Sequence, residues 1–336
     1  MIKEVIHSLV DGIDLSEAEM AECMNEIMEG MATNAQIAAF LTALRIKGET
    51  VEEITGAAKI MRKKAVSIKS PDGVFDTCGT GGDMAHTFNI STTAAIVVSA
   101  AGVPVAKHGN RSVSSQCGSA DVLETLGVKI DLPPEKVEKC LFETGFGFLF
   151  APLFHPAMKY AIGPRREMGI RTIFNILGPL TNPAGAKRQI VGVYAEGLTE
   201  TLAMVLGNLG SVDALVIYGN DGLDEISISD ATKVSRFKDG KVENFTIMPE
   251  DFGIMRNKIE SILGGTKVDN AVIIRAILNG EKGPRRDIVL INSAAALIVA
   301  GKSEDFKTAL AMAADAIDSG RASKKLEEIK KVSNSV

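Results

Sequence analysis

The spacing of apolar residues changes near residue 70 of this 336-residue chain, and the change limits the fold more than any other feature. Residues 1 to about 66 show helical spacing only. From Phe75 onward, short apolar runs alternate with helical segments, which is typical of an α/β domain. We therefore predict an α/β fold with a small all-α domain and a central, mainly parallel sheet.

Individual elements can be placed from the same pattern and from helix-start signals. Ser16 with Glu19, and Thr50 with Glu53, each fit a capping box. The segment from 152 to about 183 has helical and turn signals without strands. The pattern predicts strands over residues 74–77, 103–106, 190–194, 214–218 and 234–237, and helices over 93–101, 288–300 and 306–319.

Three polar segments follow one another between Asp76 and Asp121. They read DTCGTGGD over 76–83, TFNIST over 87–92, and KHGNRSVSS over 107–115, the last continuing to GSAD at 118–121. Each alone is ordinary, since a glycine turn, a helix cap or a basic loop occurs in many proteins. Together they place backbone amides, hydroxyls and cations around one anion, which describes a site for a phosphorylated sugar.

The glycine-rich segment supplies the backbone part of that site. Glycine allows positive φ and leaves no side chain between the backbone and a ligand. Consecutive amides in such a turn can bind phosphate oxygens. Asp83 would repel phosphate, so we expect it to accept hydrogen bonds from loop amides or to lie near a divalent cation.

The second and third segments add helix-start and basic groups. Asn89, Ser91 and Thr92 lie where a helix begins, and we expect such residues to cap free amides at an end that favours a bound anion. Lys107 and Arg111 bring positive charge, and the asparagine and serines between 110 and 119 bring neutral hydrogen-bonding groups.

A second group of polar residues, Asp224 and Glu225, follows the predicted strand at 214–218. Loop carboxylates are usually only solvated. Magnesium, however, is often held by one or two carboxylates together with substrate phosphates and water. Beside a site for a diphosphate, we interpret this pair as a metal site.

With these motifs the chain resembles the anthranilate phosphoribosyltransferase family over essentially its whole length. Met84 and the pair Gln116-Cys117 depart from the residues usual in the family. The matching motifs are GTGGD (79–83), TFNIST (87–92), KHGNR-VSS (107–115), GSADVLE (118–124), FHPAMK (154–159), RRE-GIRTIFNILGPLTNP (165–183) and GLDEIS (222–227).

The resemblance implies a two-domain fold like that of nucleoside phosphorylases and phosphoribosyltransferases. Residues 1–66 would form the helical domain, joined by about 152–185, and 72–336 would form the α/β phosphoribosyl-binding domain. The active cleft would lie between the two domains. The family also implies a homodimer through the helical domain. The apolar stripe at Met20, Met24, Ile27, Met28 and Met31 is read either as core or, in part, as the dimer face.

The resemblance also implies a role for individual residues. Anthranilate would contact Gly79, Asn110 and Arg165, with His108, His155 and Pro179 near its path. Ser91, Asp224 and Glu225 would bind magnesium, with two ions per monomer. Phosphoribosyl pyrophosphate (PRPP) would be bound by Gly79, Gly82, Asp83, Thr87, Asn89, Ile90, Ser91, Thr92, Lys107, His108, Gly109, Asn110, Arg111, Ser112, Val113, Ser114, Ser115 and Ser119.

The implied reaction couples the amine of anthranilate to C1 of the ribose as pyrophosphate leaves, a step of tryptophan biosynthesis. Magnesium and Lys107 would neutralise the leaving group. No residue is assigned as a catalytic acid or base, because an aromatic amine loses its proton easily once the C–N bond forms. For His108 we expect a binding or structural role.

Composition limits the remaining classes of protein. A net charge of -5 argues against a nucleic-acid binder, and the apolar runs are too short to span a membrane. Four cysteines without CxxC spacing indicate neither a zinc site nor a disulfide framework. The charged start Met1-Ile2-Lys3-Glu4 lacks a signal-peptide core. We therefore expect a cytoplasmic protein.

Three alternatives stay open at this point. A pyrimidine nucleoside phosphorylase would share the architecture, but its lysine-rich sugar and base motifs are missing. A non-catalytic, nucleic-acid-binding relative would have a basic cleft and would lack Asp224 and Glu225. A phosphoribosyltransferase acting on another aromatic amine is the closest rival, and only a panel of acceptors would exclude it.

Overall fold

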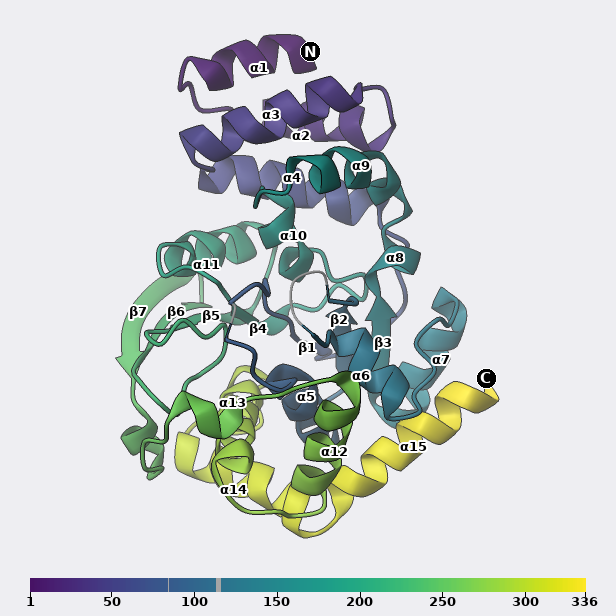
Figure 1. Cartoon of the computed structure of the whole chain (residues 1–336), viewed down its shortest axis with the longest axis vertical. Coiled ribbons are helices and arrows are strands. Elements are labelled where there is room, and N and C mark those ends of the chain that lie inside the picture. Colours follow the sequence, from purple (N-terminus) through teal and green to yellow (C-terminus); the bar gives the residue numbers. More distant parts are fainter. Residues whose placement is uncertain (84, 113–115) are drawn as a thin grey trace.

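The computed structural model describes residues 1–83, 85–112 and 116–336. A small helical lobe, which contains the N-terminus, stands on a larger α/β lobe (Figure 1). The first helices of the small lobe are α1 (Ile2–Val10), α2 (Glu17–Met28), α3 (Asn34–Lys47) and α4 (Val51–Lys64). The prediction that the chain begins with helices only is confirmed.

Local signals in the sequence explain where these helices begin. The Ser16 hydroxyl accepts a hydrogen bond from the Glu19 amide at 3.3 Å, and the Thr50 hydroxyl accepts one from the Glu53 amide at 3.2 Å. Both capping boxes are therefore confirmed. The methionine stripe is core at Met20, Met24, Ile27 and Met28, whereas Met31 is 61% exposed.

One sheet of seven strands occupies the large lobe within the described residues, in the order β3-β2-β1-β4-β5-β6-β7. The first five of these strands run parallel, and β6 and β7 are antiparallel to their neighbours. A central, mainly parallel sheet is thus confirmed. The strands are β1 (Phe75–Thr77), β2 (Val105–Gly109), β3 (Phe146–Phe150), β4 (Arg188–Gly192), β5 (Asp213–Gly219), β6 (Thr232–Lys238) and β7 (Lys241–Ile247).

Helices cover both faces of this sheet, and β5 shows how its residues divide between them. Leu215 and Ile217 point into the core on one side, and Ala214 and Val216 point into the core on the other. The helices of the large lobe are α5 (Ile90–Ala100), α6 (Ser119–Thr125), α7 (Pro134–Thr144), α11 (Leu198–Asn208), α12 (Lys267–Leu278), α13 (Pro284–Val299), α14 (Phe306–Asp318) and α15 (Arg321–Ser335), with 3-10 turns η2 (Pro249–Phe252) and η3 (Ile259–Ile262).

The segment between β3 and β4 returns to the small lobe. It consists of α8 (Ala151–Phe154), η1 (Pro156–Met158), α9 (Lys159–Met168) and α10 (Phe174–Leu180), without a strand, as predicted. Helix α9 packs on α2 and α3, and α10 packs on α4 (Figure 1). Ala161 and Leu177 share a core with Phe40 of α3. The limits of the two domains stay a prediction.

Two negative findings concern the described part of the chain. None of its helices combines the length and the apolar character needed to cross a membrane. Its four cysteines, Cys23, Cys78, Cys117 and Cys140, are all free thiols.

Candidate active site

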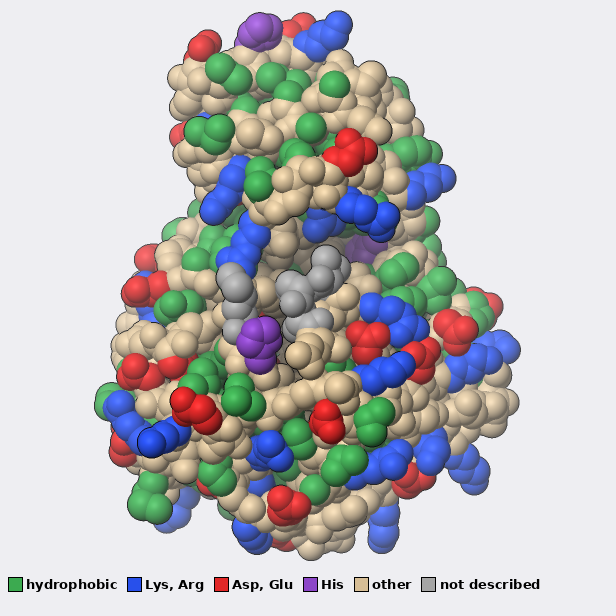
Figure 2. Space-filling view, viewed as in Figure 1, with side chains coloured by type: hydrophobic (Ala, Val, Ile, Leu, Met, Phe, Trp, Pro, Cys, Tyr) green, Lys and Arg blue, Asp and Glu red, His purple; other side chains and the backbone are tan. Residues whose placement is uncertain are grey.

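The site lies where the strand order reverses. Strand β1 is flanked by β2 on one side and β4 on the other, and the loops after these parallel strands meet at their carboxyl ends. Such a switch point is where open α/β sheets bind ligands. Figure 2 shows the surface hollowed between the two lobes there, with Lys and Arg side chains gathered beside the hollow.

The glycine-rich loop after β1 is held by backbone contacts. The Thr80 amide donates to the Gly192 carbonyl at 2.8 Å, and the Gly81 amide donates to Asp224 Oδ2 at 3.0 Å. Gly81 and Gly82 have φ of +65° and +77°, which side chains rarely adopt. A Cβ on Gly79 would lie 2.5 Å from Asp224 Oδ2. The loop therefore needs glycine both for its shape and for close contact with Asp224.

The rest of this loop connects to more distant segments. Asp83 accepts a hydrogen bond from the Ala85 amide at 3.3 Å. This is the first of the two roles that we expected for it, that of an acceptor for loop amides. The Gly82 carbonyl accepts a hydrogen bond from the Arg171 guanidinium. Thr87 forms an isolated antiparallel bridge with Leu263, so its backbone pairs with the loop before α12.

The start of α5 differs from the prediction in two ways. The helix begins at Ile90, three residues before the predicted 93. The Asn89 side chain does not cap it, which corrects our expectation: its amide nitrogen donates to the Cys117 carbonyl at 3.1 Å. The Ser91 amide is instead satisfied by Glu225 Oε1 at 2.9 Å. A carboxylate from a distant loop therefore takes the place of the cap.

Two of the predicted donor-binding residues at this helix start have buried side chains. The Ile90 amide donates to the Phe88 carbonyl at 2.7 Å, and the Ile90 side chain is in the main core. The Thr92 side chain is buried as well. Their roles in binding PRPP stay a prediction.

Lys107 of β2 is a buried cation at the centre of the site. Its Nζ donates to the Thr77 carbonyl, to Thr77 Oγ1 at 3.2 Å and to Ser91 Oγ at 3.4 Å. Burial raises the pKa of nearby Asp76 to about 6, and the positive charge of Lys107 opposes that rise. Among the described residues its hydrogen-bond partners are neutral oxygens, and such a buried ammonium is suited to bind an incoming anion.

Asp224 and Glu225 form a pair of half-buried carboxylates facing Lys107 and α5. Burial, followed by the charge of Asp83, raises the pKa of Asp224 to about 7. Burial, followed by the charge of Asp224, raises the pKa of Glu225 to about 8. Like charges in a poorly solvated site favour either protonation or a bound cation.

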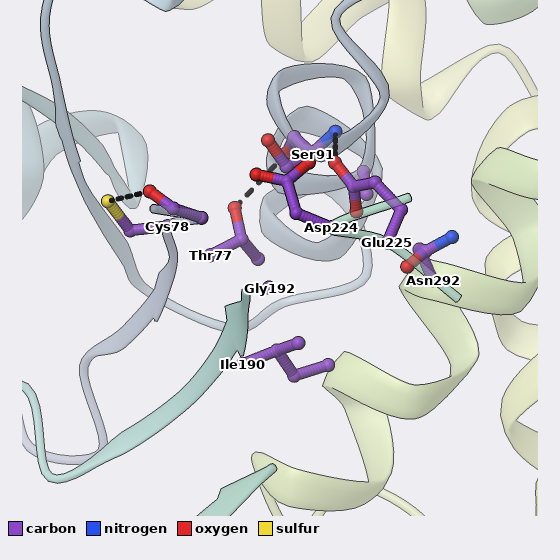
Figure 3. A pocket seen from close by; sticks show the side chains of 10 residues that line it. Thr77, Cys78, Ser91, Ile190, Gly192, Asp224, Glu225 and Asn292 are labelled. Atoms are coloured by element: carbon purple, nitrogen blue, oxygen red, sulfur yellow. Dashed lines mark hydrogen bonds between the residues drawn. The ribbon is translucent and has the colours of Figure 1, made fainter. Parts of the chain in front are cut away.

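The donor atoms of this pair fit magnesium. No group of three His, Cys, Asp or Glu side chains with metal-site geometry occurs in the described ranges, so the protein offers only part of a coordination shell. Magnesium is usually held in this way, because substrate phosphates and water complete its shell. Figure 3 shows Asp224 and Glu225 beside Ser91 in a pocket. The pocket is lined by Thr77, Cys78, Gly79, Ser91, Ala94, Ile190, Gly192, Asp224, Glu225 and Asn292.

The basic loop after β2 is tied to α6. The Arg111 guanidinium pairs with Asp121 at 2.8 Å and with Glu124 at 2.9 Å. The Ser112 amide also donates to Asp121, at 3.2 Å. These contacts direct the Arg111 charge toward α6, so its predicted contact with the donor remains a prediction.

Other residues of this loop were also predicted to close over the donor. Ser119 Oγ donates to the Asn110 carbonyl at 3.3 Å, and a Cβ on Gly109 would lie 2.3 Å from that hydroxyl. Asn110 Oδ1 accepts from the Arg111 amide at 2.8 Å. Three further predicted residues of this loop lie outside the described ones: Val113, Ser114 and Ser115.

Arg165 of α9 lies on the small-lobe side of the cleft. Its guanidinium stacks over the Phe174 ring at 5.1 Å, and burial lowers its pKa. Nowhere in the described ranges does a carboxylate pair with it, and no hydrogen bond joins it to Asn110 or Gly79. A half-buried cation without a carboxylate partner among the described residues provides a place for a ligand carboxylate.

Two histidines lie behind the acceptor side. The His108 and His155 rings are 5.0 Å apart, and His108 Nδ1 is 3.0 Å from the Gly178 carbonyl. Burial lowers the pKa of His108 to about 3 and that of His155 to about 4, so both rings are neutral near pH 7. This agrees with leaving the catalytic base unassigned.

Three residues in the site had no predicted role. A Cβ on Gly192 would lie 1.6 Å from the Asp224 carbonyl oxygen. Arg171, besides bonding Gly82, stacks over the Tyr194 ring at 4.2 Å. Asn182 donates to Asp76 Oδ2 at 2.7 Å and to the Ala106 carbonyl at 2.8 Å. Two of these residues could have been identified from the sequence. Gly192 ends an apolar strand, and Asn182 lies in the GPLTNP motif.

Comparison with known proteins agrees with this geometry. Residues 71–323 match the a/b domain of the glycosyl transferase family, and residues 3–65 match its helical bundle domain. The anthranilate phosphoribosyltransferase of Moorella thermoacetica is 60% identical over 97% of this chain and 97% of its own length. That of Acetivibrio thermocellus is 56% identical over 100% of this chain and 97% of its own length.

Solved structures give the same result. The anthranilate phosphoribosyltransferase of Thermus thermophilus superposes with a TM-score of 0.94 at 39% identity, covering 98% of this chain and 99% of its own. The enzyme of Saccharomyces cerevisiae, in complex with PRPP and Mg, superposes with a TM-score of 0.91 at 28% identity, covering 100% and 98%. The chain belongs to the anthranilate phosphoribosyltransferase family.

Proposed function

We propose that this protein transfers the phosphoribosyl group of 5-phosphoribosyl 1-pyrophosphate to the amine of anthranilate. The products are N-(5-phosphoribosyl)anthranilate and pyrophosphate, in tryptophan biosynthesis. The observation that carries this proposal is the convergence of the glycine loop, buried Lys107 and the Asp224–Glu225 pair at one edge of the sheet. The yeast relative was solved in complex with PRPP and Mg and, separately, with 4-fluoroanthranilate.

For the donor, we propose that the loop amides and Lys107 bind the phosphates. Lys107 supplies a buried positive charge, and positive φ at Gly81 and Gly82 gives the loop the turn that a phosphate cradle needs. The donor-binding residues would be Gly79, Gly82, Asp83, Thr87, Asn89 to Thr92, Lys107 to Ser112 and Ser119.

For the acceptor, we propose that Arg165 binds the carboxylate of anthranilate. The support is its burial and the lack of a carboxylate partner among the described residues. A guanidinium pairs with a carboxylate through two parallel hydrogen bonds. Asn110 and Gly79 would contact the ring and the amine from the opposite lobe, which would bring the nitrogen toward C1 of the ribose.

The reaction then needs little chemistry from side chains. The amine nitrogen forms a bond to C1 while the bond from C1 to the pyrophosphate oxygen breaks. Lys107 neutralises charge on the leaving group, and aligning the two substrates lowers the barrier further. Magnesium, when bound, would add charge neutralisation at the pyrophosphate. The amine proton passes to solvent, so we assign no residue as acid or base.

We further propose that Ser91, Asp224 and Glu225 hold magnesium, with two ions per monomer. The raised pKa values of the two carboxylates support this, because a cation would relieve their repulsion. In the variant Asp224→Asn with Glu225→Gln, activity should depend on a much higher magnesium concentration. An unchanged magnesium titration would exclude the pair as metal ligands.

The reaction itself can be tested by mixing the protein with PRPP, magnesium and anthranilate and following anthranilate fluorescence. The proposal requires a loss of fluorescence that depends on all three. If PRPP binds by calorimetry and fluorescence does not change, the acceptor is wrong, and a panel of aromatic amines would find it. If PRPP does not bind either, the proposed function is wrong.

We also propose a homodimer through the small lobe and a location in the cytoplasm. Val10 and Ile46 of the small lobe are 71% and 81% exposed and would supply apolar side chains to such an interface. Ile46→Glu should therefore give monomers in analytical ultracentrifugation. The free thiols agree with a reducing compartment. The domain limits proposed above, 1–66 with about 152–185 and 72–336, can be tested by limited proteolysis.

A further inference from the structure

The loop that carries Asp224 and Glu225 has no regular secondary structure, yet it presents two adjacent carboxylates to the cleft. Apolar side chains on either side of the pair anchor it. Leu223 and Ile226 are 0% and 1% exposed and lie in the core that α13 also lines. These anchors fix the depth of the loop, but apolar contacts are non-directional and do not fix the rotation of its peptide groups.

A buried side chain of α13 supplies the missing directional contacts. Asn292 Oδ1 accepts a hydrogen bond from the Ile226 amide at 3.0 Å, and Asn292 Nδ2 donates to the Ile226 carbonyl at 3.0 Å. Its second amide hydrogen bonds the Ile288 carbonyl one turn earlier at 2.9 Å, which fixes the orientation of the side chain. Both backbone groups of Ile226, the residue that follows Glu225, are thereby held to α13. Figure 3 shows Asn292 on this helix beside Glu225.

We infer that Asn292 is a positioning residue for magnesium binding, an inference that rests on the metal role proposed for Asp224 and Glu225. Asn292 is itself 4% exposed and lines the pocket of the carboxylate pair. It holds the backbone on one side of Glu225, and the Ser91 amide of α5 holds the Glu225 carboxylate at 2.9 Å. Because α13 packs directly on α5, both contacts belong to one rigid support.

The energetics favour a role in geometry. Without Asn292, the amide and carbonyl of Ile226 would be buried without partners, which costs about 1–3 kcal/mol for each group. The loop would rotate to recover hydrogen bonds, and Glu225 would move with it. Partners that orient metal ligands through hydrogen bonds typically change metal affinity by about 10- to 100-fold when removed.

The test is the variant Asn292→Leu, which keeps the number and branching of the side-chain heavy atoms and removes the hydrogen bonds. Mn²⁺ binding would be measured by electron paramagnetic resonance with PRPP present and anthranilate absent, so that no turnover occurs, and corrected for metal bound by PRPP alone. We expect Mn²⁺ affinity to fall about 10- to 100-fold. Excess metal should restore much of the activity. The matched control is Ser293→Ala, since the neighbouring Ser293 hydroxyl is buried without a partner in the described structure.

A second variant keeps the test decisive if Asn292→Leu fails to fold. Asn292→Ala leaves space in which water can bond the Ile226 peptide, so it should fold while still weakening Mn²⁺ binding. If the folded variant binds Mn²⁺ like the wild type, or loses thermal stability without loss of affinity, the role of Asn292 is wrong. If the wild type itself binds no Mn²⁺ with PRPP, the proposed metal role of the carboxylate pair is wrong instead.

Discussion

The two sides of the cleft are built differently. On the donor side, the glycine loop, the start of α5 and the loop after β5 bond one another directly, through Gly81 to Asp224 and Ser91 to Glu225. On the acceptor side, Arg165 stacks on Phe174, and within the described ranges it pairs with no carboxylate. The donor side therefore has its shape before a ligand arrives, whereas the acceptor side offers a positive charge with which the carboxylate of a ligand would pair.

This difference assigns different tasks to the two sides. The donor side needs backbone precision, because several groups must meet one diphosphate and its metal at once. The acceptor side needs one strong directional contact to orient a small aromatic acid. Mutations should then act in different ways: backbone changes should abolish donor binding, and the loss of one side chain should weaken acceptor binding alone.

Gly192→Ala should have the largest effect. The new Cβ would lie 1.6 Å from the Asp224 carbonyl oxygen, so the loop carrying both carboxylates must move. Displacement of about 1 Å in an active site can cost about 100-fold in rate, and we expect at least that loss of kcat/KM together with weaker PRPP binding. Gly197→Ala is the matched control, because nothing lies within 4 Å of its Cβ position. Normal PRPP binding by Gly192→Ala would contradict a rigid donor side.

Arg165→Ala should affect mainly one substrate. Losing a charge-assisted hydrogen-bonded pair costs about 1.5–3 kcal/mol, so the KM for anthranilate should rise by about 10- to 100-fold. The KM for PRPP should change much less. Arg166→Ala, which removes the exposed neighbouring guanidinium, serves as the control in steady-state kinetics. Equal effects on both substrates would remove Arg165 from the acceptor site.

The buried histidines predict a pH dependence of stability. Below about pH 6.5 the unfolded chain protonates both rings, whereas the folded chain does so only near pH 3 for His108 and pH 4 for His155. The contribution of these two rings to the free energy of unfolding should therefore fall with decreasing pH, by up to about 1.4 kcal/mol per unit for each ring. The raised pKa values of Asp76, Asp224 and Glu225 contribute in the opposite direction. Urea unfolding of the wild type and of His155→Phe between pH 6.5 and 5 would isolate the histidine part of the slope, because the carboxyl groups are common to both proteins. His155→Phe should remove about half of it, and an unchanged slope would contradict neutral burial.

Glu124→Gln should have the smallest effect. It weakens an exposed ion pair with Arg111, and such pairs contribute about 0–1 kcal/mol to stability. If Arg111 turns toward the donor phosphates, the KM for PRPP should also decrease. Glu143→Gln, in the remote surface pair with Lys139, is the control. A rise in the KM for PRPP would show that the pair with α6 holds Arg111 in its working position.

Local and periodic signals predicted most of the fold. The capping boxes, the parallel sheet and the strand-free segment before β4 all follow from the spacing of apolar residues and from the positions of turn and helix-cap residues. Strand β3 was missed, because the run FGFLF is apolar throughout and could equally belong to a buried helix. Strand β7 was missed although Asp239 and Gly240, with φ of 50° and 76°, form a hairpin turn that the dipeptide Asp-Gly favours.

The sequence predicted which residues belong to the site better than it predicted the contacts between them. Sequence motifs identified Asp224 and Glu225, but they gave no sign that Glu225 would replace Asn89 in capping α5. The support from Asn292 comes from 66 residues away. Contacts between residues so far apart in the chain depend on how the sheet and helices pack. They therefore cannot be predicted from the spacing of residues along the chain.

The close approach of Asp224 to Gly79 and Gly192 also limits how such a chain can evolve. A side chain at either glycine collides with Asp224 or its backbone as long as the loop keeps its place. A mutation there would become tolerable only after the loop had shifted, and a shifted loop would no longer present its carboxylates. These three positions should therefore be inherited as a unit, and a lineage that replaced one of them would have abandoned the magnesium-dependent reaction first.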